Sequence, residues 1–366
     1  MSSGVAELAS CLVRIPSVNP DGDPGTNETG EARMADFLEG HLLGLGAEVE
    51  LREVFPGRPN VLARFPSDRP GKPRLLLAPH TDTVSVAGMT IDPFSGEIRD
   101  GKVRGRGATD TKGPMAAMLH ALSECASKLP KLSHEVWFAG LMGEETGLHG
   151  SRALAATDRF DFVIAGEPTG LESVATHKGS ARWILETTGR AAHSSTPEAG
   201  ENAIDTAMDA IAWLKARFAE TARPHPTLGA PTLSVGIVRG GSKINIVPDH
   251  CRAEIDMRTT PGFPDEDLIA AVRGHWPKIR LQLDGAPSLD TDPAHPLIRK
   301  LNALGSPCAV APWFCDAASF AARGMPAIAL GPGSIKQAHT ADEWISVADL
   351  EAGATLFSRF LHSLSQ

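Results

Sequence analysis

The sequence has few cysteines, and none of them stand at a spacing that binds metal through sulfur. The five cysteines are scattered over 366 residues, are odd in number and form no CxxC pair. Such a set fits neither a disulfide framework nor a thiolate metal site. A metal ion in this protein must therefore be held by histidine and carboxylate side chains.

Basic charge and long apolar runs are also scarce. Lys and Arg total 35 against 44 Asp and Glu, which leaves a net charge of −9. This balance argues against nucleic acid or a membrane surface as the partner, because both bind through clustered basic residues. No apolar stretch reaches the ~18 residues that span a bilayer, and residues 1–16 lack the basic flank and apolar run of a secretory signal. We therefore expect a cytoplasmic protein whose partner is a small molecule.

Several short apolar runs are present instead, and each leads to a histidine or an acid. They span residues 74–80, 135–145, 162–167 and 327–331. Runs of this length are typical of strands buried on both faces, so the sequence predicts an α/β fold with a mostly parallel sheet. Flanking helices are expected at 30–45, 113–128 and 347–364. The polar residues then fall at the carboxyl ends of the strands, where open α/β sheets build their sites.

The middle of the chain has a different pattern, which predicts a second domain. Residues 181–188 alternate like a half-exposed strand, and a helix, two strands, a helix and a strand are expected at 202–222, 232–238, 249–258, 263–273 and 279–283. This order is that of a ferredoxin-like α+β unit. A chain of this length is expected to form two domains. We therefore predict a catalytic domain of residues 1–177 and 287–366, interrupted by a second domain of residues 178–286.

The segment His80-Thr81-Asp82 is the first candidate for metal chemistry. Residues two apart at the end of a strand point to the same side, so Asp82 can reach the far ring nitrogen of His80. This is the arrangement of a metal-binding histidine and its supporting carboxylate. Capping of a turn or helix is the alternative role for Asp82.

Further acids and one histidine follow at later positions of the same kind. Asp110 lies in a glycine-rich loop before a helix, where its two oxygens can each face one of two metals. Glu144 and Glu145 are neighbours in an extended segment and point to opposite sides, so that one can bind metal while the other contacts a water. Glu167 and His339 supply one further ligand each.

These nitrogen and oxygen ligands suit two Zn²⁺ ions, and Co²⁺ or Mn²⁺ would also be accepted. Two metals about 3.5–4 Å apart lower the pKa of a bound water, the nucleophile, and polarise a carbonyl. Glu144 can take the proton of that water as general base and later give it to the leaving amine. A solvated partner of Lys or Arg is the alternative role for Glu144. The set therefore predicts a hydrolase of amide bonds.

Taken together, the motifs resemble those of the M20 metallopeptidase family. The matching segments cover nearly the whole chain and are 80–82, 105–113, 143–145, 166–168, 192–194, 245–248 and 337–339. The resemblance implies that Asp110 bridges two metals. His80 and Glu167 would complete one site, and Glu145 and His339 the other.

Residues 79–84 and 331–340 look most like the branch of acetylornithine deacetylase and succinyl-diaminopimelate desuccinylase. This resemblance implies a deacetylase-like enzyme that cleaves the amide bond of a small N-acyl amino acid, with Gly333 contacting the substrate. Carboxypeptidases and dipeptidases share most of these motifs, so short peptides are the alternative substrates. A non-catalytic amino-acid sensor fits less well, because such a protein would be expected to lack Glu144 or a ligand.

The inserted domain resembles the lid of the family, which commonly forms a dimer interface, so a homodimer is expected. His193 resembles the lid histidine that stabilises the oxyanion of the tetrahedral intermediate, a donor worth about 3–4 kcal/mol of barrier. Arg258 resembles the arginine that anchors a substrate carboxylate. A planar guanidinium can bind a carboxylate through two parallel hydrogen bonds. Asn245 is expected to add a polar contact. Alternatively, His193 satisfies groups of its own loop, and Arg258 pairs with Glu254 or Asp256.

Overall fold

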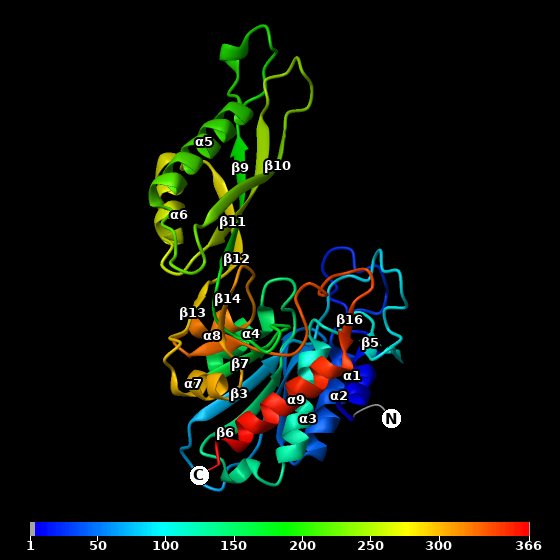
Figure 1. Cartoon of the computed structure of the whole chain (residues 1–366). Coiled ribbons are helices and arrows are strands. Elements are labelled where there is room, and N and C mark those ends of the chain that lie inside the picture. Colours follow the sequence, from blue (N-terminus) through cyan, green and yellow to red (C-terminus); the bar gives the residue numbers. More distant parts are fainter. Residues whose placement is uncertain (1–3, 366) are drawn as a thin grey trace. The chain divides into compact units, whose positions relative to one another are not determined.

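The computed structural model describes residues 4–365 and divides the chain into two compact units (Figure 1). The larger unit contains the described residues up to Thr176, then Leu289–Val310, and the described residues from Cys315 on. The smaller unit contains His177–Ser288 and Ala311–Phe314.

Residues 311–314 belong to the smaller unit, although they were expected in the larger domain. Lys178 donates its backbone N–H to the carbonyl of Ala311 over 3.1 Å. The ring of Trp313 lies beside that of His177, with 6.3 Å between the centroids. Contacts between segments far apart in the chain therefore decide where these four residues pack.

A nine-stranded sheet forms the centre of the larger unit in the described part of the chain, with the order β1-β2-β6-β3-β7-β15-β8-β13 and β14 paired to β8. The strands are β1 (Glu48–Phe55), β2 (Arg58–Arg64), β3 (Arg74–Pro79), β6 (Glu135–Gly140), β7 (Phe162–Gly166), β8 (Ser173–His177), β13 (Leu289–Asp290), β14 (Cys308–Ala311) and β15 (Ala327–Ala329). The central strands β6, β3, β7 and β15 are parallel, whereas β1, β2 and β8 pair antiparallel. The predicted mostly parallel α/β sheet is confirmed.

Helices flank this sheet (Figure 1). They are α1 (Gly4–Val13), α2 (Ala32–Gly44), α3 (Lys112–Cys125), α4 (His149–Thr157), α7 (Pro296–Ala303), α8 (Ala317–Ala321) and α9 (Val347–His362), with a 3-10 turn η1 (Leu129–Lys131). Leu75 and Leu77 of β3 belong to one apolar core with α1, α2, α3 and α9. Leu76, which lies between them, is equally buried but does not belong to that core. Burial on both faces explains why these strands are continuously apolar. None of the described helices has the length and apolar content of a transmembrane segment.

A small antiparallel sheet joins the segment before α3 to the segment before α9. Its strands are β4 (Ile98–Arg99), β5 (Lys102–Arg104) and β16 (Trp344–Ser346), in the order β16-β5-β4. Asp110 follows β5, and His339 precedes β16. The pairing therefore brings two distant parts of the chain that carry candidate ligands side by side.

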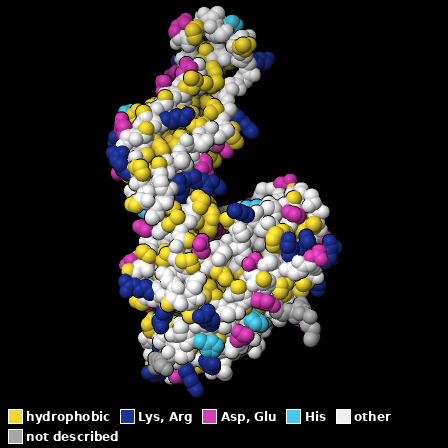
Figure 2. All heavy atoms as spheres, viewed as in Figure 1, with side chains coloured by type: hydrophobic (Ala, Val, Ile, Leu, Met, Phe, Trp, Pro, Cys, Tyr) yellow, Lys and Arg dark blue, Asp and Glu magenta, His cyan; other side chains and the backbone are white. Residues whose placement is uncertain are grey.

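The smaller unit has the predicted ferredoxin-like order. Its elements are β9 (Gly179–Thr188), η2 (Pro197–Ala199), α5 (Ala203–Thr221), β10 (Thr232–Gly240), β11 (His250–Thr259), α6 (Asp265–His275) and β12 (Arg280–Ala286). The sheet order is β10-β11-β9-β12, and each neighbouring pair is antiparallel. Alternate residues of β11, among them Ile255 and Met257, are buried in a core with Trp183, Leu214 and Phe218. Acidic and basic side chains are interspersed on the visible face of each unit (Figure 2).

Candidate active site

The carboxyl ends of β3, β6, β7 and β15 lie at one edge of the large sheet, because these strands are parallel. His80 follows β3 directly, and Glu167 follows β7 directly. Glu144 and Glu145 follow β6 after a short turn, and His339 lies in the loop after β15. Parallel pairing therefore brings these side chains to the same edge, as open α/β sheets do at their sites.

Asp110 stands between the two histidines, just before α3. Its Oδ1 lies 3.0 Å from Nε2 of His80, and its Oδ2 lies 3.3 Å from Nε2 of His339. Nε2 of His339 also lies 3.3 Å from Oε2 of Glu145. Each oxygen of Asp110 thus faces a different histidine, which is the geometry of a carboxylate set between two cation positions.

Potential ligand atoms form three groups, within each of which all atoms lie within 4.8 Å of one another. The groups are His80, Asp110 and Glu167; Asp110, Glu145 and His339; and His80, Glu144 and Glu145. The first two groups share Asp110. The structure therefore brings all five predicted ligands together, with Glu144 beside them.

Asp82 is fully buried and holds the loop that carries the two glutamates. Its carboxylate accepts the backbone N–H of Glu144 (3.0 Å) and of Glu145 (3.2 Å), and Asn19 donates its side-chain amide to it (2.8 Å). Nδ1 of His80 lies 3.0 Å from the main-chain oxygen of Asp82 but 3.5 Å from its carboxylate. The closer support of His80 therefore comes from the main chain, and the carboxylate mainly orients Glu144 and Glu145.

Acidic side chains are concentrated in this buried site. Burial raises the pKa of Glu144 and of Glu167 well above the usual range, and neighbouring carboxylates add to the effect. Burial and the Asp110 carboxylate also raise the pKa of Glu145. No group among the described residues donates a hydrogen bond to the buried Oε1 of Glu145. A bound cation would remove the repulsion and supply that oxygen with a partner, so the donor set fits divalent metal ions.

The two histidines offset part of this charge. Hydrogen bonds with Asp110 and Glu145 raise the pKa of His339 to about 10. Burial disfavours the charged ring of His80, but its contacts with Asp110 and Asp82 raise its pKa well above the usual value. The ring of His339 is therefore protonated near neutral pH in the metal-free protein, and it must lose a proton to bind a metal.

The two candidate metal positions differ in exposure. The side chains of His80 and Asp110 are 1% and 8% exposed, whereas that of His339 is 52% exposed. The position beside His339 is therefore the more open one. Gly333 lies in the same unit, and its carbonyl accepts the backbone N–H of Gly170 over 2.8 Å.

His193, Asn245 and Arg258 belong to the smaller unit. His193 is exposed, and its Nδ1 lies 2.8 Å from the hydroxyl of Ser195, a contact within its own loop. A β-bridge joins His193 to Ile246, the residue after Asn245.

Arg258 donates its Nε to Asp256 over 2.9 Å. Its guanidinium carbon lies 5.9 Å from the centroid of the Phe314 ring. The pairing with Asp256 that was considered as the alternative for Arg258 is therefore present.

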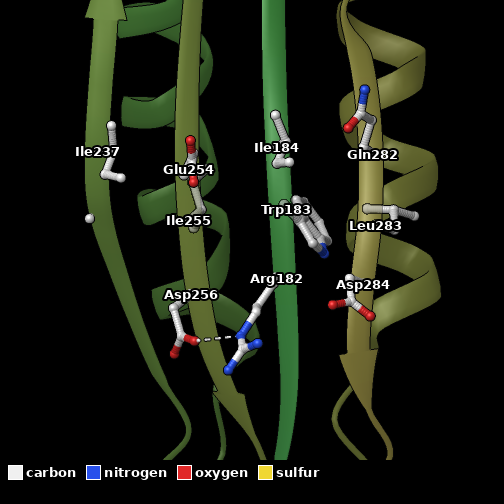
Figure 3. Close-up of a pocket in the computed structure, with 11 residues that line it drawn as sticks. Arg182, Trp183, Ile184, Ile237, Glu254, Ile255, Asp256, Gln282, Leu283 and Asp284 are labelled. Carbon is white, nitrogen blue, oxygen red and sulfur yellow. Dashed lines mark ion pairs between the residues drawn. The ribbon is translucent and has the colours of Figure 1, made fainter. Parts of the chain in front are cut away.

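A groove of about 470 Å³ lies on the sheet of the smaller unit (Figure 3). All four strands contribute to it, and Ile184 and Leu283 stand beside charged residues. Arg182 and Asp256 form an ion pair there, with 3.6 Å between their nearest charged atoms. None of the candidate metal ligands lines this groove.

Asn19 and Glu343 were not predicted from the sequence, although both contact the site. Asn19 donates to Asp82, and the buried Glu343 accepts the backbone N–H of Asp110 over 3.0 Å. The position of Glu343 four residues after His339 is a signal that could have found it. Asn19 lies far from every motif, and nothing local in the sequence marks it.

A family model described as "Peptidase family M20/M25/M40" matches residues 76–363, which include every candidate ligand. The chain belongs to peptidase family M20. It is 32% identical over 381 residues to an acetylornithine deacetylase of Proteus mirabilis, covering 98% of this chain and 96% of that protein. The predicted family is confirmed, and this M20 protein is a metal-dependent hydrolase that acts on C–N amide bonds.

Solved M20 structures share the fold. The aminopeptidase PepT of Bacillus cereus matches with a TM-score of 0.76 and 22% identity, over 99% of this chain and 98% of that chain. A metallo-carboxypeptidase of the M20 family from Sulfolobus solfataricus matches with a TM-score of 0.77 and 18% identity, over 98% of both chains. At these identities the likeness establishes the architecture, a sheet-based domain with an inserted α+β domain.

Proposed function

We propose that this M20 protein is a di-metal amidohydrolase that removes the acyl group of a small N-acyl amino acid, in the manner of an acetylornithine deacetylase. The observation that carries the proposal is the meeting of the five predicted ligands around Asp110, with Glu144 beside them. The identity of 32% over 98% of the chain to an acetylornithine deacetylase supports the choice of substrate class.

In this proposal, His80 and Glu167 hold one metal ion, Glu145 and His339 hold the other, and Asp110 is shared. Nitrogen and oxygen donors of this kind suit Zn²⁺, and Co²⁺ or Mn²⁺ can replace it. When bound, two such ions supply Lewis acidity that polarises the scissile carbonyl and makes a water acidic enough to attack it.

Glu144 serves as the general base and then as the general acid. Its carboxylate lies in one group of ligand atoms with His80 and Glu145, so it can reach a water placed beside them. Glu144 takes the proton from the water and delivers it to the leaving amine. Asp82 keeps the base in position because it accepts the backbone N–H of Glu144.

The proposed substrate contacts follow from the resemblance to the family. His193 donates a hydrogen bond to the oxyanion of the tetrahedral intermediate. Arg258 grips the substrate carboxylate, and Asn245 and Gly333 add polar contacts. The present bond between Arg258 and Asp256 involves Nε, whereas a carboxylate would be gripped by the two Nη atoms.

A homodimer through the smaller unit is part of the proposal. β10 is an edge strand, and Val238 on it is 52% exposed. Met208 of α5 is 61% exposed. Exposed strand edges and apolar side chains of this kind favour pairing with a second copy. Light scattering should give twice the chain mass of 38.6 kDa, and a monomer at every concentration would contradict the dimer.

A substrate panel tests the proposed reaction. Protein reconstituted with Zn²⁺ or Co²⁺ is assayed for amine release from N-acetylornithine, N-acetylmethionine, N-succinyl-diaminopimelate and a set of dipeptides. We expect turnover of at least one acyl amino acid in preference to the dipeptides, and turnover about 10²–10⁴-fold slower by the matched Glu144→Gln variant. Faster turnover of dipeptides would make the protein an exopeptidase, and no hydrolysis of any substrate by a metal-loaded sample would refute the proposal.

A further inference from the structure

Glu343 is a buried carboxylate outside the candidate ligand set, and four hydrogen-bond donors surround it. Its side chain is 0% exposed. Oε1 accepts the backbone N–H of Thr109 (2.9 Å) and of Asp110 (3.0 Å). Oε2 accepts the backbone N–H of Gly107 (3.0 Å) and Nη1 of Arg106 (2.7 Å). The loop that ends at Asp110 is therefore wrapped around one charged group.

Arg106 connects this carboxylate to the segment that carries the second histidine. Its Nη1 also donates to the carbonyl of Thr340 (3.2 Å), the residue directly after His339. Its Nε donates to the carbonyl of Ser85 (3.0 Å). The ion pair of Arg106 and Glu343 thus contacts the chain beside Asp110 and beside His339 at the same time.

The backbone around the pair is held in register as well. Gly105 donates its N–H to the carbonyl of Glu343 (3.0 Å), and the hydroxyl of Thr109 donates to the carbonyl of Trp344 (2.7 Å). Trp344 and Arg104 are partners where β16 pairs with β5. Neither loop can shift along the other without breaking these contacts.

We infer that the Arg106–Glu343 pair is a positioning device that sets where Asp110 and His339 stand relative to each other. Burial of two charges is costly, and ion pairs of this kind are weak evidence for a gain in stability. Here every contact of the carboxylate goes to a loop that carries a candidate ligand. The inference rests on the proposed function, because it treats Asp110 and His339 as ligands of one metal.

Metal affinity is the quantity that this inference predicts. Loss of a residue that orients metal ligands typically weakens metal binding about 10–100-fold. The position between Asp110, Glu145 and His339 depends on the pair for two of its three ligands, whereas the position on His80 and Glu167 depends on it only through Asp110. The loss should therefore be larger for one of the two metal equivalents than for the other.

The variant Glu343→Gln tests this inference. Glutamine offers one oxygen and one NH₂ group, so some of the N–H donors that now face a carboxylate oxygen would face the NH₂ group, which is itself a donor. Glu135→Gln is the matched control. Glu135 is a buried glutamate that binds Arg64 through 2.8 and 3.0 Å contacts, and it lies at the amino end of β6, at the other end of the strand from Glu144.

Zn²⁺ affinity is measured for each equivalent by competition with a coloured chelator, and turnover is measured as a function of Zn²⁺ concentration. For Glu343→Gln we expect one equivalent to weaken about 10–100-fold, the other to weaken less, and turnover to recover at high Zn²⁺. Both affinities should stay at the wild-type value in Glu135→Gln. Equal losses in the two variants, or unchanged affinities in a folded Glu343→Gln, would overturn the inference.

If Glu343→Gln does not fold, Arg106→Lys replaces it, because lysine keeps the charge but cannot reach Glu343, Thr340 and Ser85 together. A loss of affinity in that variant supports the inference, and unchanged affinity overturns it. Wild-type protein that binds less than one equivalent would refute the proposed function and this inference with it. If the wild-type protein binds two equivalents of Zn²⁺ and the affinities of Glu343→Gln are unchanged, the positioning role alone is refuted.

Discussion

Binding of metal should release protons, because His339 is protonated in the metal-free protein. The pKa of His339 is raised to about 10 by Asp110 and Glu145, so its ring is almost fully protonated at pH 7. The pKa of His80 is also raised well above its usual value by Asp110 and Asp82, against the effect of burial. A metal ion binds only the neutral ring, so filling the position beside His339 displaces its proton, and protons held by His80, Glu145 and Glu167, whose pKa values are also raised, add to the release.

The number of protons released sets how steeply the metal affinity depends on pH. Release of at least one proton per chain, that of His339, makes the overall constant for binding two Zn²⁺ ions rise at least about 10-fold for each unit of pH near neutrality. The sign follows from the raised pKa values, because the protonated rings compete with the metal most strongly at low pH. The dependence should weaken as the pH approaches the pKa of His339, about 10, where that ring is already half neutral.

Isothermal titration of Zn²⁺ into the metal-free protein measures the effect. Titrations at one pH in buffers of different ionisation enthalpy give the number of protons released. The variant His339→Gln is the control and should release about one proton fewer while losing one tight equivalent. Release of less than about half a proton by the wild-type protein would refute the reasoning, because the ring of His339 would then be neutral or would not bind the metal.

Three further outcomes are expected. Glu144→Gln should lower kcat about 10²–10⁴-fold with unchanged metal content, and near wild-type turnover would exclude it as the base. Asp82→Ala should weaken Zn²⁺ binding about 10–100-fold in chelator competition, because Glu144 and Glu145 lose the carboxylate that accepts their backbone N–H groups. Burial raises the pKa of Asp316 from 3.8 to about 7, so ionisation destabilises the metal-free protein as the pH rises through this range. Asp316→Asn should therefore be more stable in urea by about 2–4 kcal/mol at pH 8, with little difference at pH 4.

The sequence by itself determined the central parallel strands of the large sheet and the set of candidate ligands. A run such as residues 162–166 is apolar at every position because both faces of β7 are covered, and such a pattern is visible without coordinates. The candidate acids and histidines directly follow such runs or lie in glycine-rich loops beside a helix. Their meeting at one edge then follows from parallel pairing, which the same apolar runs predict.

Only the tertiary structure decided which atoms support these residues. Asp82 was expected to hold the ring of His80, but its carboxylate mainly binds the backbone of Glu144 and Glu145, a contact between segments about sixty residues apart. Glu343 reaches the loop of Asp110 from the far end of the chain. Local patterns report which faces of an element are buried, whereas hydrogen bonds between loops depend on how distant segments pack, which no local pattern contains.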